Sequence, residues 1–287
     1  MGLAPTQCLW IIGGTQESAT IVRAIAHRKL EPTSYLISVT TPAAVNLYPA
    51  GTDVWVGRLT PDRLSTFLND YQIGAILDAS HPFATAISEL AIAAAHKYSL
   101  PYLRYERPAC TGVACNAASL APSASPACSP APTNLLTVPD YPTLLAGDLL
   151  AGHRVLLTVG YQALALFAPW QSRATLFARI LPSATALAAA QAAGFEPQRL
   201  IAVRPPLTPA FEKALWQQWQ ITTVVTKASG AAGGEWVKHQ IADSLGVRLV
   251  IIARPMVNYP QVTNRLSEAI AFAIGDLWSG AKLSAFQ

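Results

Sequence analysis

The sequence predicts an α/β protein with two Rossmann-like domains, each built on a parallel sheet, and a ligand cleft between them. Short apolar runs alternate with helical stretches along most of the chain, which is typical of parallel sheets with helices on both faces. The alternation stops at residues 110–133, which are rich in Ala, Ser, Pro and Thr, and then resumes. The chain has 287 residues, which is enough for two ordinary domains of roughly 100–200 residues each.

The first half begins with an apolar strand that leads directly into a glycine turn. We expect the strand at Cys8–Ile12, the turn at Gly13-Gly14-Thr15 and a helix over about Gln16–Arg28. Thr60 and Pro61 mark another helix start, because Thr is favoured as the N-cap residue and Pro at the first helical position. The further elements expected in this half are strands at Ser34–Val39, Asp53–Val56, Ile73–Leu77 and Pro101–Arg104, and helices at Pro61–Tyr71 and Ala84–His96.

The same alternation returns after residue 134. The expected strands are Arg154–Thr158, Thr175–Ile180, Leu200–Val203, Thr222–Thr226 and Arg248–Ile252. The expected helices are Tyr141–Ala151, Tyr161–Phe167, Ala184–Ala193, Pro209–Trp219, Glu235–Leu245 and Thr263–Trp278. We therefore predict a first domain at residues 1–109 and a second at 135–287. The Pro/Ala/Ser-rich residues 110–134 between them are an insertion or linker, because this composition cannot bury a core of its own.

Composition and charge exclude several classes of protein. The net charge of +4 is mild and no basic stripe is present, so we expect no nucleic-acid partner. The longest uncharged run, Pro108 to Pro139, is interrupted by prolines and cannot form a helix across a membrane. Three of the four cysteines lie in the insertion without a nearby His, so no metal site is expected. Low cysteine use and the absence of an export signal in Met1–Trp10 favour the cytoplasm.

Candidate ligand-binding residues follow the predicted strands, because open α/β sheets bind ligands outside the carboxyl ends of their strands. The Gly13-Gly14-Thr15 turn suits a pyrophosphate at a helix N-terminus. A tight turn without a ligand is the alternative, since the third glycine of the dinucleotide fingerprint is absent. Asp78 and His81 are candidates for acid–base chemistry, with an N-cap and a rigid His-Pro turn as the alternative.

Cationic side chains also gather at predicted strand ends in both halves. Arg104, Arg179 and Arg254 can bind carboxylates or phosphates through planar guanidinium groups, or can form ion pairs within the protein. The loop Lys227-Ala228-Ser229-Gly230 is either an anion-binding nest or a flexible connection. The mild positive charge of the chain is compatible with an acidic small molecule as the ligand.

The motifs form an ordered set that extends along nearly the whole chain. They are IIGGTQE at 11–17, VGRL at 56–59, DASHPFA at 78–84, LRYERP at 103–108, LTVG at 157–160, ARILP at 178–182, VTKASG at 225–230 and ARP at 253–255. Each motif is weak alone. Together and in this order they resemble the precorrin-6A reductase and cobalt-precorrin-6A reductase family of corrin biosynthesis. Ser80 stands where the family often has Thr, and Ala228 where it often has Asn.

The resemblance implies an oxidoreductase of cobalamin biosynthesis that transfers hydride from NAD(P)H to the macrocycle and gives precorrin-6B or its cobalt counterpart. NADPH is the expected cofactor. NADH is left open, because Ser38-Val39-Thr40-Thr41 lacks the arginine that many members carry after the second strand. The implied partner is an acidic tetrapyrrole substrate, with other corrin-pathway enzymes as further candidates. Neither a metal of its own nor a membrane is implied.

The resemblance and the strand-end positions together assign roles to individual residues. The catalytic candidates, as proton donors, are Lys227 and His81, with water as an alternative source of the proton. The substrate-binding residues are Arg104, Arg179, Ser229, Gly230 and Arg254. The cofactor-binding residues are Gly13, Gly14, Thr15, Glu17, Ser38, Thr40, Gly57, Arg58, Asp78 and Ser80.

Two other classes of protein stay open at this point. An atypical oxidoreductase similar to the short-chain dehydrogenases would also begin with a nucleotide-binding turn, but their Tyr-x-x-x-Lys pair is absent throughout. A non-catalytic NAD(P)-sensing protein would not need the cationic strand ends of the second half. An assay of hydride transfer to the tetrapyrrole separates the sensor from the enzyme.

Overall fold

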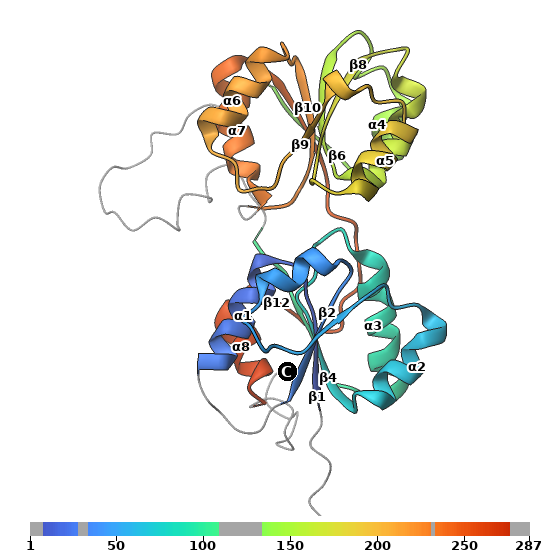
Figure 1. Ribbon diagram of the computed structural model, residues 1–287, viewed down its shortest axis with the longest axis vertical. Coiled ribbons are helices and arrows are strands. Elements are labelled where there is room, and N and C mark those ends of the chain that lie inside the picture. The colour runs from blue at the N-terminus through green and yellow to red at the C-terminus, as the bar shows by residue number, and fades with distance from the viewer. Residues whose placement is uncertain (1–7, 28–33, 109–133, 231–232, 276–287) are drawn as a thin grey trace, which may run out of the picture. The chain divides into compact units, whose positions relative to one another are not determined.

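The chain forms two compact α/β units in the computed structural model, which describes residues 8–27, 34–108, 134–230 and 233–275 (Figure 1). The first unit comprises the described residues up to 108 and from 256 to 275, and the second comprises 134–255. Each unit has a six-stranded sheet with helices on both faces. The predicted fold class is therefore confirmed, whereas the cleft stays a prediction.

The sheet of the first unit has the order β12-β5-β4-β1-β2-β3, and all of its strands are parallel. The strands are β1 (Cys8–Ile12), β2 (Tyr35–Val39), β3 (Val54–Val56), β4 (Ile73–Asp78), β5 (Tyr102–Tyr105) and β12 (Val262–Thr263). The helices are α1 (Gln16–His27), α2 (Pro61–Asp70), α3 (Thr85–Tyr98), α8 (Leu266–Ala273) and the short 3₁₀ helix η1 (Pro42–Leu47).

The central strand β1 is apolar along its whole length because both of its faces are covered. Leu9 and Ile11 pack with residues of α1 and α8 on one face of the sheet. Trp10 and Ile12 pack with residues of α2 and α3 on the other face. The strict alternation of a strand thus divides one apolar run between two cores. Figure 1 shows α1 and α8 on one face of the sheet and α2 and α3 on the other.

The end of the chain belongs to the first unit, which corrects the predicted boundaries of the second domain. β12 pairs with β5, and Phe272 of α8 is buried in the core cluster formed with β1 and α1. The prediction had placed all of residues 135–287 in the second domain as one block, with a single helix at Thr263–Trp278. The difference arises because β12 has only two residues, too few to show a strand period.

The sheet of the second unit has the order β6-β11-β10-β7-β8-β9 and is also parallel throughout. The strands are β6 (Leu135–Val138), β7 (Arg154–Thr158), β8 (Thr175–Ile180), β9 (Leu200–Ala202), β10 (Thr223–Lys227) and β11 (Arg248–Ile252). The helices are α4 (Tyr141–Ala146), α5 (Ala184–Ala192), α6 (Pro209–Gln218) and α7 (Glu235–Leu245), with 3₁₀ helices η3 (Tyr161–Trp170) and η4 (Pro197–Arg199).

Three elements of the second unit differ from the prediction for local reasons. The edge strand β6 was not expected, because it directly follows the Pro/Ala/Ser-rich segment. Helix α4 ends at Ala146 since Gly147 adopts an extended conformation. The predicted helix at Tyr161–Phe167 is a longer 3₁₀ helix that contains Pro169.

The expectations about the insertion and about membrane-spanning helices can be compared with the described residues only in part. The insertion, apart from Asn134, lies outside the described residues, as do Cys110, Cys115 and Cys128. Among the described residues, no helix is both long and apolar enough to cross a membrane.

Candidate functional site

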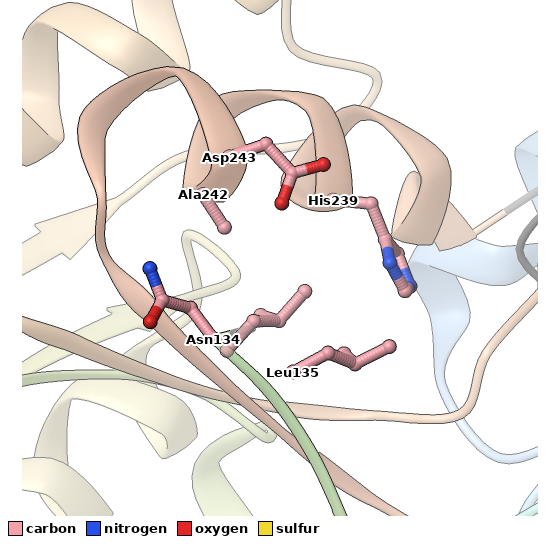
Figure 2. Close-up of a pocket in the computed structure, with 6 residues that line it drawn as sticks. Asn134, Leu135, His239, Ala242 and Asp243 are labelled. Atoms are coloured by element: carbon pink, nitrogen blue, oxygen red, sulfur yellow. The ribbon is translucent and has the colours of Figure 1, made fainter. Parts of the chain in front are cut away.

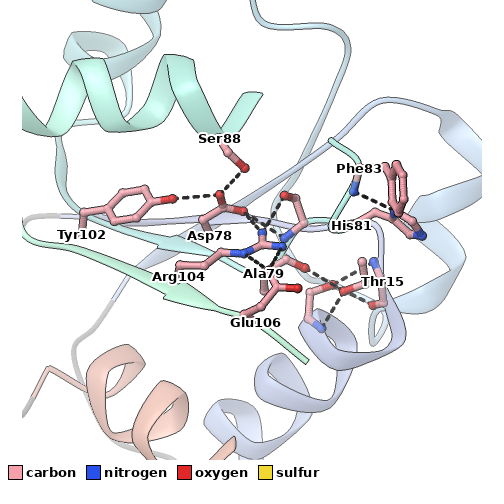
Figure 3. Close-up of polar contacts among 11 residues, drawn as sticks. Thr15, Asp78, Ala79, His81, Phe83, Ser88, Tyr102, Arg104 and Glu106 are labelled. Atoms are coloured by element: carbon pink, nitrogen blue, oxygen red, sulfur yellow. Dashed lines mark hydrogen bonds and ion pairs between the residues drawn. The ribbon is translucent and has the colours of Figure 1, made fainter. Parts of the chain in front are cut away.

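The glycine turn lies at the point in the first sheet where the strand order reverses. The chain leaves β1 towards β2 and β3 on one side, whereas β4 and β5 lie on the other side, so the turn after β1 and the loop after β4 are neighbours. Thr15 Oγ1 donates a hydrogen bond to the backbone oxygen of Ala79 at 2.8 Å and joins the two (Figure 3). Such a switch point is where doubly wound sheets bind ligands.

The turn leads into α1 through a reciprocal pair of capping hydrogen bonds. Thr15 Oγ1 accepts from the Ser18 amide at 3.1 Å, and Ser18 Oγ accepts from the Thr15 amide at 3.2 Å. The Gly13 amide donates to the Ser38 oxygen, and the Gly14 amide to Tyr48 Oη. The three amides predicted to hold a pyrophosphate therefore already have acceptors within the protein.

The next two amides along the chain are the open ones. Gln16 and Glu17 occupy the first two helical positions, whose amides have no acceptor within a helix. Neither amide has a hydrogen-bond acceptor among the described residues. Among the described residues of this turn, the amides still able to bind an anion are therefore those at the start of α1 and not those of Gly13, Gly14 and Thr15.

Both glycines of the turn are required by its geometry. Gly14 has φ +91°, a conformation that other residues rarely adopt. A Cβ atom on Gly13 would lie 2.2 Å from Tyr48 Oη, so this glycine makes room for a phenol. Sequence reasoning missed Tyr48 because it lies 34 residues after Gly14 and belongs to no motif.

Asp78 is completely buried at the end of β4, and both of its carboxylate oxygens accept hydrogen bonds (Figure 3). Oδ1 accepts from the Ser80 amide at 3.0 Å and from Arg104 at 2.8 Å. Oδ2 accepts from Ser88 Oγ at 2.6 Å and from Tyr102 Oη at 2.9 Å. Burial and the Asp78 charge raise the pKa of Tyr102, which stays a donor. Asp78 therefore organises the strand ends rather than presenting a carboxylate to a cofactor.

Arg104 is also buried, which contradicts its predicted place on a substrate-facing surface. The register of β4 and β5 sets it directly beside Asp78, and its side chain is 1% exposed. Its guanidinium donates hydrogen bonds to Asp78 Oδ1 and to Ser80 Oγ, so the Ser80 oxygen faces the protein interior. The guanidinium also forms an ion pair with Glu106 at 2.7 Å. Two carboxylates thus hold this cation within the unit.

His81 follows this network and is half-buried in the loop after β4. Its Nδ1 accepts a hydrogen bond from the Phe83 amide at 3.2 Å (Figure 3). In the neutral ring the hydrogen must then be on Nε2. The backbone of the His-Pro turn therefore fixes which nitrogen can donate.

The remaining predicted cofactor residues lie at the ends of β2 and β3. The Gly57 amide donates to the Val39 oxygen at 2.9 Å, so these two strand ends are adjacent. Ser38 is buried and accepts from Trp10 Nε1, whereas Thr40 and Arg58 are exposed.

Glu17, predicted to bind the cofactor, forms an ion pair with Arg107 at 3.2 Å. Its Oε2 atom is buried and has no hydrogen-bond partner among the described residues. A buried acceptor is thus available beside the open amides of α1.

The second unit has its own switch point between β7 and β10, and Lys227 ends β10 there. Burial lowers the pKa of Lys227 from its ordinary value. The Gly230 amide, predicted to bind substrate, donates instead to the buried carboxylate of Glu235 at 2.7 Å. Ser229 is buried in the same loop.

The two predicted arginines of this unit have partners within it. Arg254 Nε donates to the Ala228 oxygen at 2.9 Å, which ties the end of β11 to the Lys227 loop. Arg179 forms an ion pair with Glu212 at 2.7 Å, and the two side chains are 11% and 5% exposed. Substrate contacts by these arginines stay a prediction.

Figure 2 shows a shallow recess elsewhere in the second unit, lined by Leu135, His239 and Asp243 among others. Leu135 and Leu249 line it near the amino ends of β6 and β11, beside His239 of α7. Its position is the opposite of that expected for a ligand site in a parallel sheet.

Two doubly wound parallel sheets, with a glycine turn at the first switch point and a lysine at the second, define a two-domain Rossmann-like protein. The model of the family described as "Precorrin-6x reductase CbiJ/CobK" matches residues 8–273. The chain therefore belongs to this family of reductases, as the resemblance predicted.

Relatives and one solved structure agree with this assignment. A cobalt-precorrin-6A reductase of Synechocystis sp. is 45% identical over 92% of this chain and 95% of its own length. One from Priestia megaterium is 31% identical over 91% of this chain and 95% of its own length. A structure of CobK precorrin-6A reductase shares the fold with a TM-score of 0.69 at 23% identity, and covers 96% of this chain and 98% of its own.

We expect Arg104→Met to lower the free energy of unfolding by about 3–5 kcal/mol, because it leaves the buried Asp78 carboxylate without its cation. Arg265→Met is the matched control. The side chains of Arg265 and of its partner Glu268 are 74% and 47% exposed. The free energy of unfolding should therefore fall by less than about 1 kcal/mol. Urea unfolding, with hydrogen exchange of β4 and β5, measures both. Equal losses for the two variants would contradict the central role of Arg104.

Proposed function

We propose that this protein is an NAD(P)H-dependent reductase of cobalt-precorrin-6A or precorrin-6A, with precorrin-6B or its cobalt counterpart as product. Family membership over residues 8–273 is the observation that carries the proposal. The Synechocystis relative, at 45% identity, is named for the cobalt-containing substrate, which favours that form. A cytoplasmic location accords with this role in biosynthesis.

The difference between the two switch points supports a nucleotide site on the first unit. There, the amides of Gln16 and Glu17 are open at the N-terminus of the 12-residue helix α1. In the second unit, the Glu235 carboxylate already accepts from the Gly230 amide, so this donor is not available to a phosphate. The pyrophosphate therefore belongs at the start of α1. Glu17 Oε2 offers an acceptor for a hydroxyl or amide group of the same nucleotide.

The strand ends of β2 and β3 favour NADPH over NADH. No carboxylate follows β2, where NAD-binding sheets usually bind the ribose hydroxyls. Thr40 and Arg58 are exposed on adjacent strand ends, and a guanidinium suits a phosphate dianion. Arg58 thus replaces the arginine that is missing after β2 and binds the 2′-phosphate.

The reaction needs a hydride and a proton. The reduced nicotinamide supplies the hydride when it is bound. We assign the proton to Lys227, since burial lowers its pKa towards the range in which an acid donates efficiently. His81, with its hydrogen fixed on Nε2, is the second candidate. Cations of the second unit, Arg179 and Arg254 among them, bind the carboxylates of the tetrapyrrole.

The purified protein is expected to oxidise NADPH in the presence of cobalt-precorrin-6A, faster than NADH and faster than with the metal-free substrate. The absorbance of the nicotinamide measures the oxidation of NADPH, and the absorbance of the macrocycle measures the reduction of the substrate. Arg58→Ala should raise the KM for NADPH by about tenfold, the value of one charge-assisted contact, and leave the KM for NADH unchanged. Nucleotide binding without any reduction would favour the NAD(P)-sensing protein instead.

Replacing Gln16 by Pro tests the open amides directly. Proline at the first helical position removes one amide donor and is tolerated by the helix. We expect the Kd for NADPH to rise about tenfold, by calorimetry, at an unchanged Tm. Ala184→Pro, at the first position of α5, is the matched control and should bind NADPH normally. If both variants bind equally well, the pyrophosphate lies elsewhere.

A proton donor at Lys227 predicts a specific pH dependence of turnover. The donor must be protonated, so kcat should fall as pH rises through the Lys227 pKa, which lies below 10.5 because of burial. Lys227→Arg should remove this alkaline decline, and Lys227→Met should reduce kcat by at least about tenfold at saturating substrate. His81→Gln is the comparison in stopped-flow measurements. A larger loss of kcat in His81→Gln would reverse the assignment.

A further inference from the structure

Tyr48 has no place in the motifs, yet its hydroxyl lies inside the glycine turn of the first unit. The residue follows η1 and is 8% exposed, and its ring belongs to the core cluster with Ile37. Its Oη lies 2.7 Å from the Gly14 amide and 2.8 Å from Ser18 Oγ. The hydroxyl fits here because residue 13 is glycine; a Cβ atom at this position would overlap with it.

The direction of each hydrogen bond in this group follows from the number of protons available. Ser18 Oγ donates its only hydrogen to the Thr15 oxygen at 2.7 Å, so it accepts from Tyr48 Oη. Tyr48 Oη in turn accepts from the Gly14 amide. One ordered chain therefore leads from Gly14 through Tyr48 and Ser18 back to Thr15. Burial raises the pKa of Tyr48, so its hydroxyl remains a donor at neutral pH.

We propose that Tyr48 is a positioning residue for nucleotide binding, which holds the Gly13–Gly14 peptide so that the amides of Gln16 and Glu17 face the ligand. This inference rests on the proposed function. The hydroxyl is an internal acceptor for one turn amide and, through Ser18, fixes the cap of α1. Gly14 is at φ +91° and lacks a side chain, and the bond to Tyr48 is the only hydrogen bond that the Gly13–Gly14 peptide makes among the described residues.

The alternative for the same geometry is that the Tyr48 hydroxyl blocks part of the nucleotide-binding site. If the nucleotide itself needed the Gly14 amide, the Tyr48 hydroxyl would compete with it, and removal of the hydroxyl would tighten binding. The two possibilities predict opposite changes in affinity, so one substitution distinguishes them.

Tyr48→Phe removes the hydroxyl and keeps the ring in the core. We expect the Kd and the KM for NADPH to rise about tenfold, the effect of one lost buried hydrogen bond, with kcat unchanged within about twofold. A purely structural loss would lower the active fraction and thus kcat. Tyr35→Phe, at the opposite end of β2, is the matched control and should bind NADPH as the wild type does.

Ser18→Ala is the second variant to be measured, because Ser18 belongs to the same chain of hydrogen bonds as Tyr48. The double variant with Tyr48→Phe should lose less affinity than the product of the two single losses. Unchanged or tighter NADPH binding by Tyr48→Phe overturns the positioning role while the proposed function stands. If the wild-type protein binds neither NADPH nor NADH, the proposed function fails and the inference fails with it.

Discussion

A buried carboxylate needs a full set of donors, and the strand ends of the first unit are arranged around that requirement. Asp78 has no exposed surface, and its charge would be costly there without Arg104 and the hydroxyls of Ser88 and Tyr102. These partners come from β5 and α3, so one side chain fixes the positions of two elements relative to β4. Through the Ala79 oxygen, the same loop receives Thr15 and thereby orients the glycine turn.

The two units solve a common problem differently. A glycine loop at the end of a central strand exposes amides that need acceptors. In the first unit the acceptor is the neutral phenol of Tyr48, and two further amides at the start of α1 stay open. In the second unit the Glu235 carboxylate takes the Gly230 amide. Among the described residues, the first unit therefore keeps two amides without an acceptor at its switch point, whereas the second unit satisfies the Gly230 amide internally.

The last described residues of the chain complete the first sheet rather than the second. β12 adds to the edge of β5 through backbone hydrogen bonds from Arg104 and Glu106, two residues whose side chains also form an ion pair with each other. Phe272 and Ala269 of α8 then close the core over β1. Tyr259, in the segment that leads to β12, lies with its ring 5.2 Å from the Arg104 guanidinium. The ion pair and the strand pairing at this edge thus involve the same two residues.

The sequence by itself determined the α/β class, most strands and helices, and the positions of the strand ends where Gly13, His81 and Lys227 lie, because period and turn residues are local signals. It also carried the family, since an ordered set of motifs needs no coordinates. Only the tertiary structure decided which polar groups are left for a ligand. Arg104, Asp78 and Gly230 looked available along the chain, but residues brought beside them by strand register or the next helix already satisfy them. Tyr48 and β12 were undetectable for the matching reason: their partners are distant in sequence, and only folding brings them together.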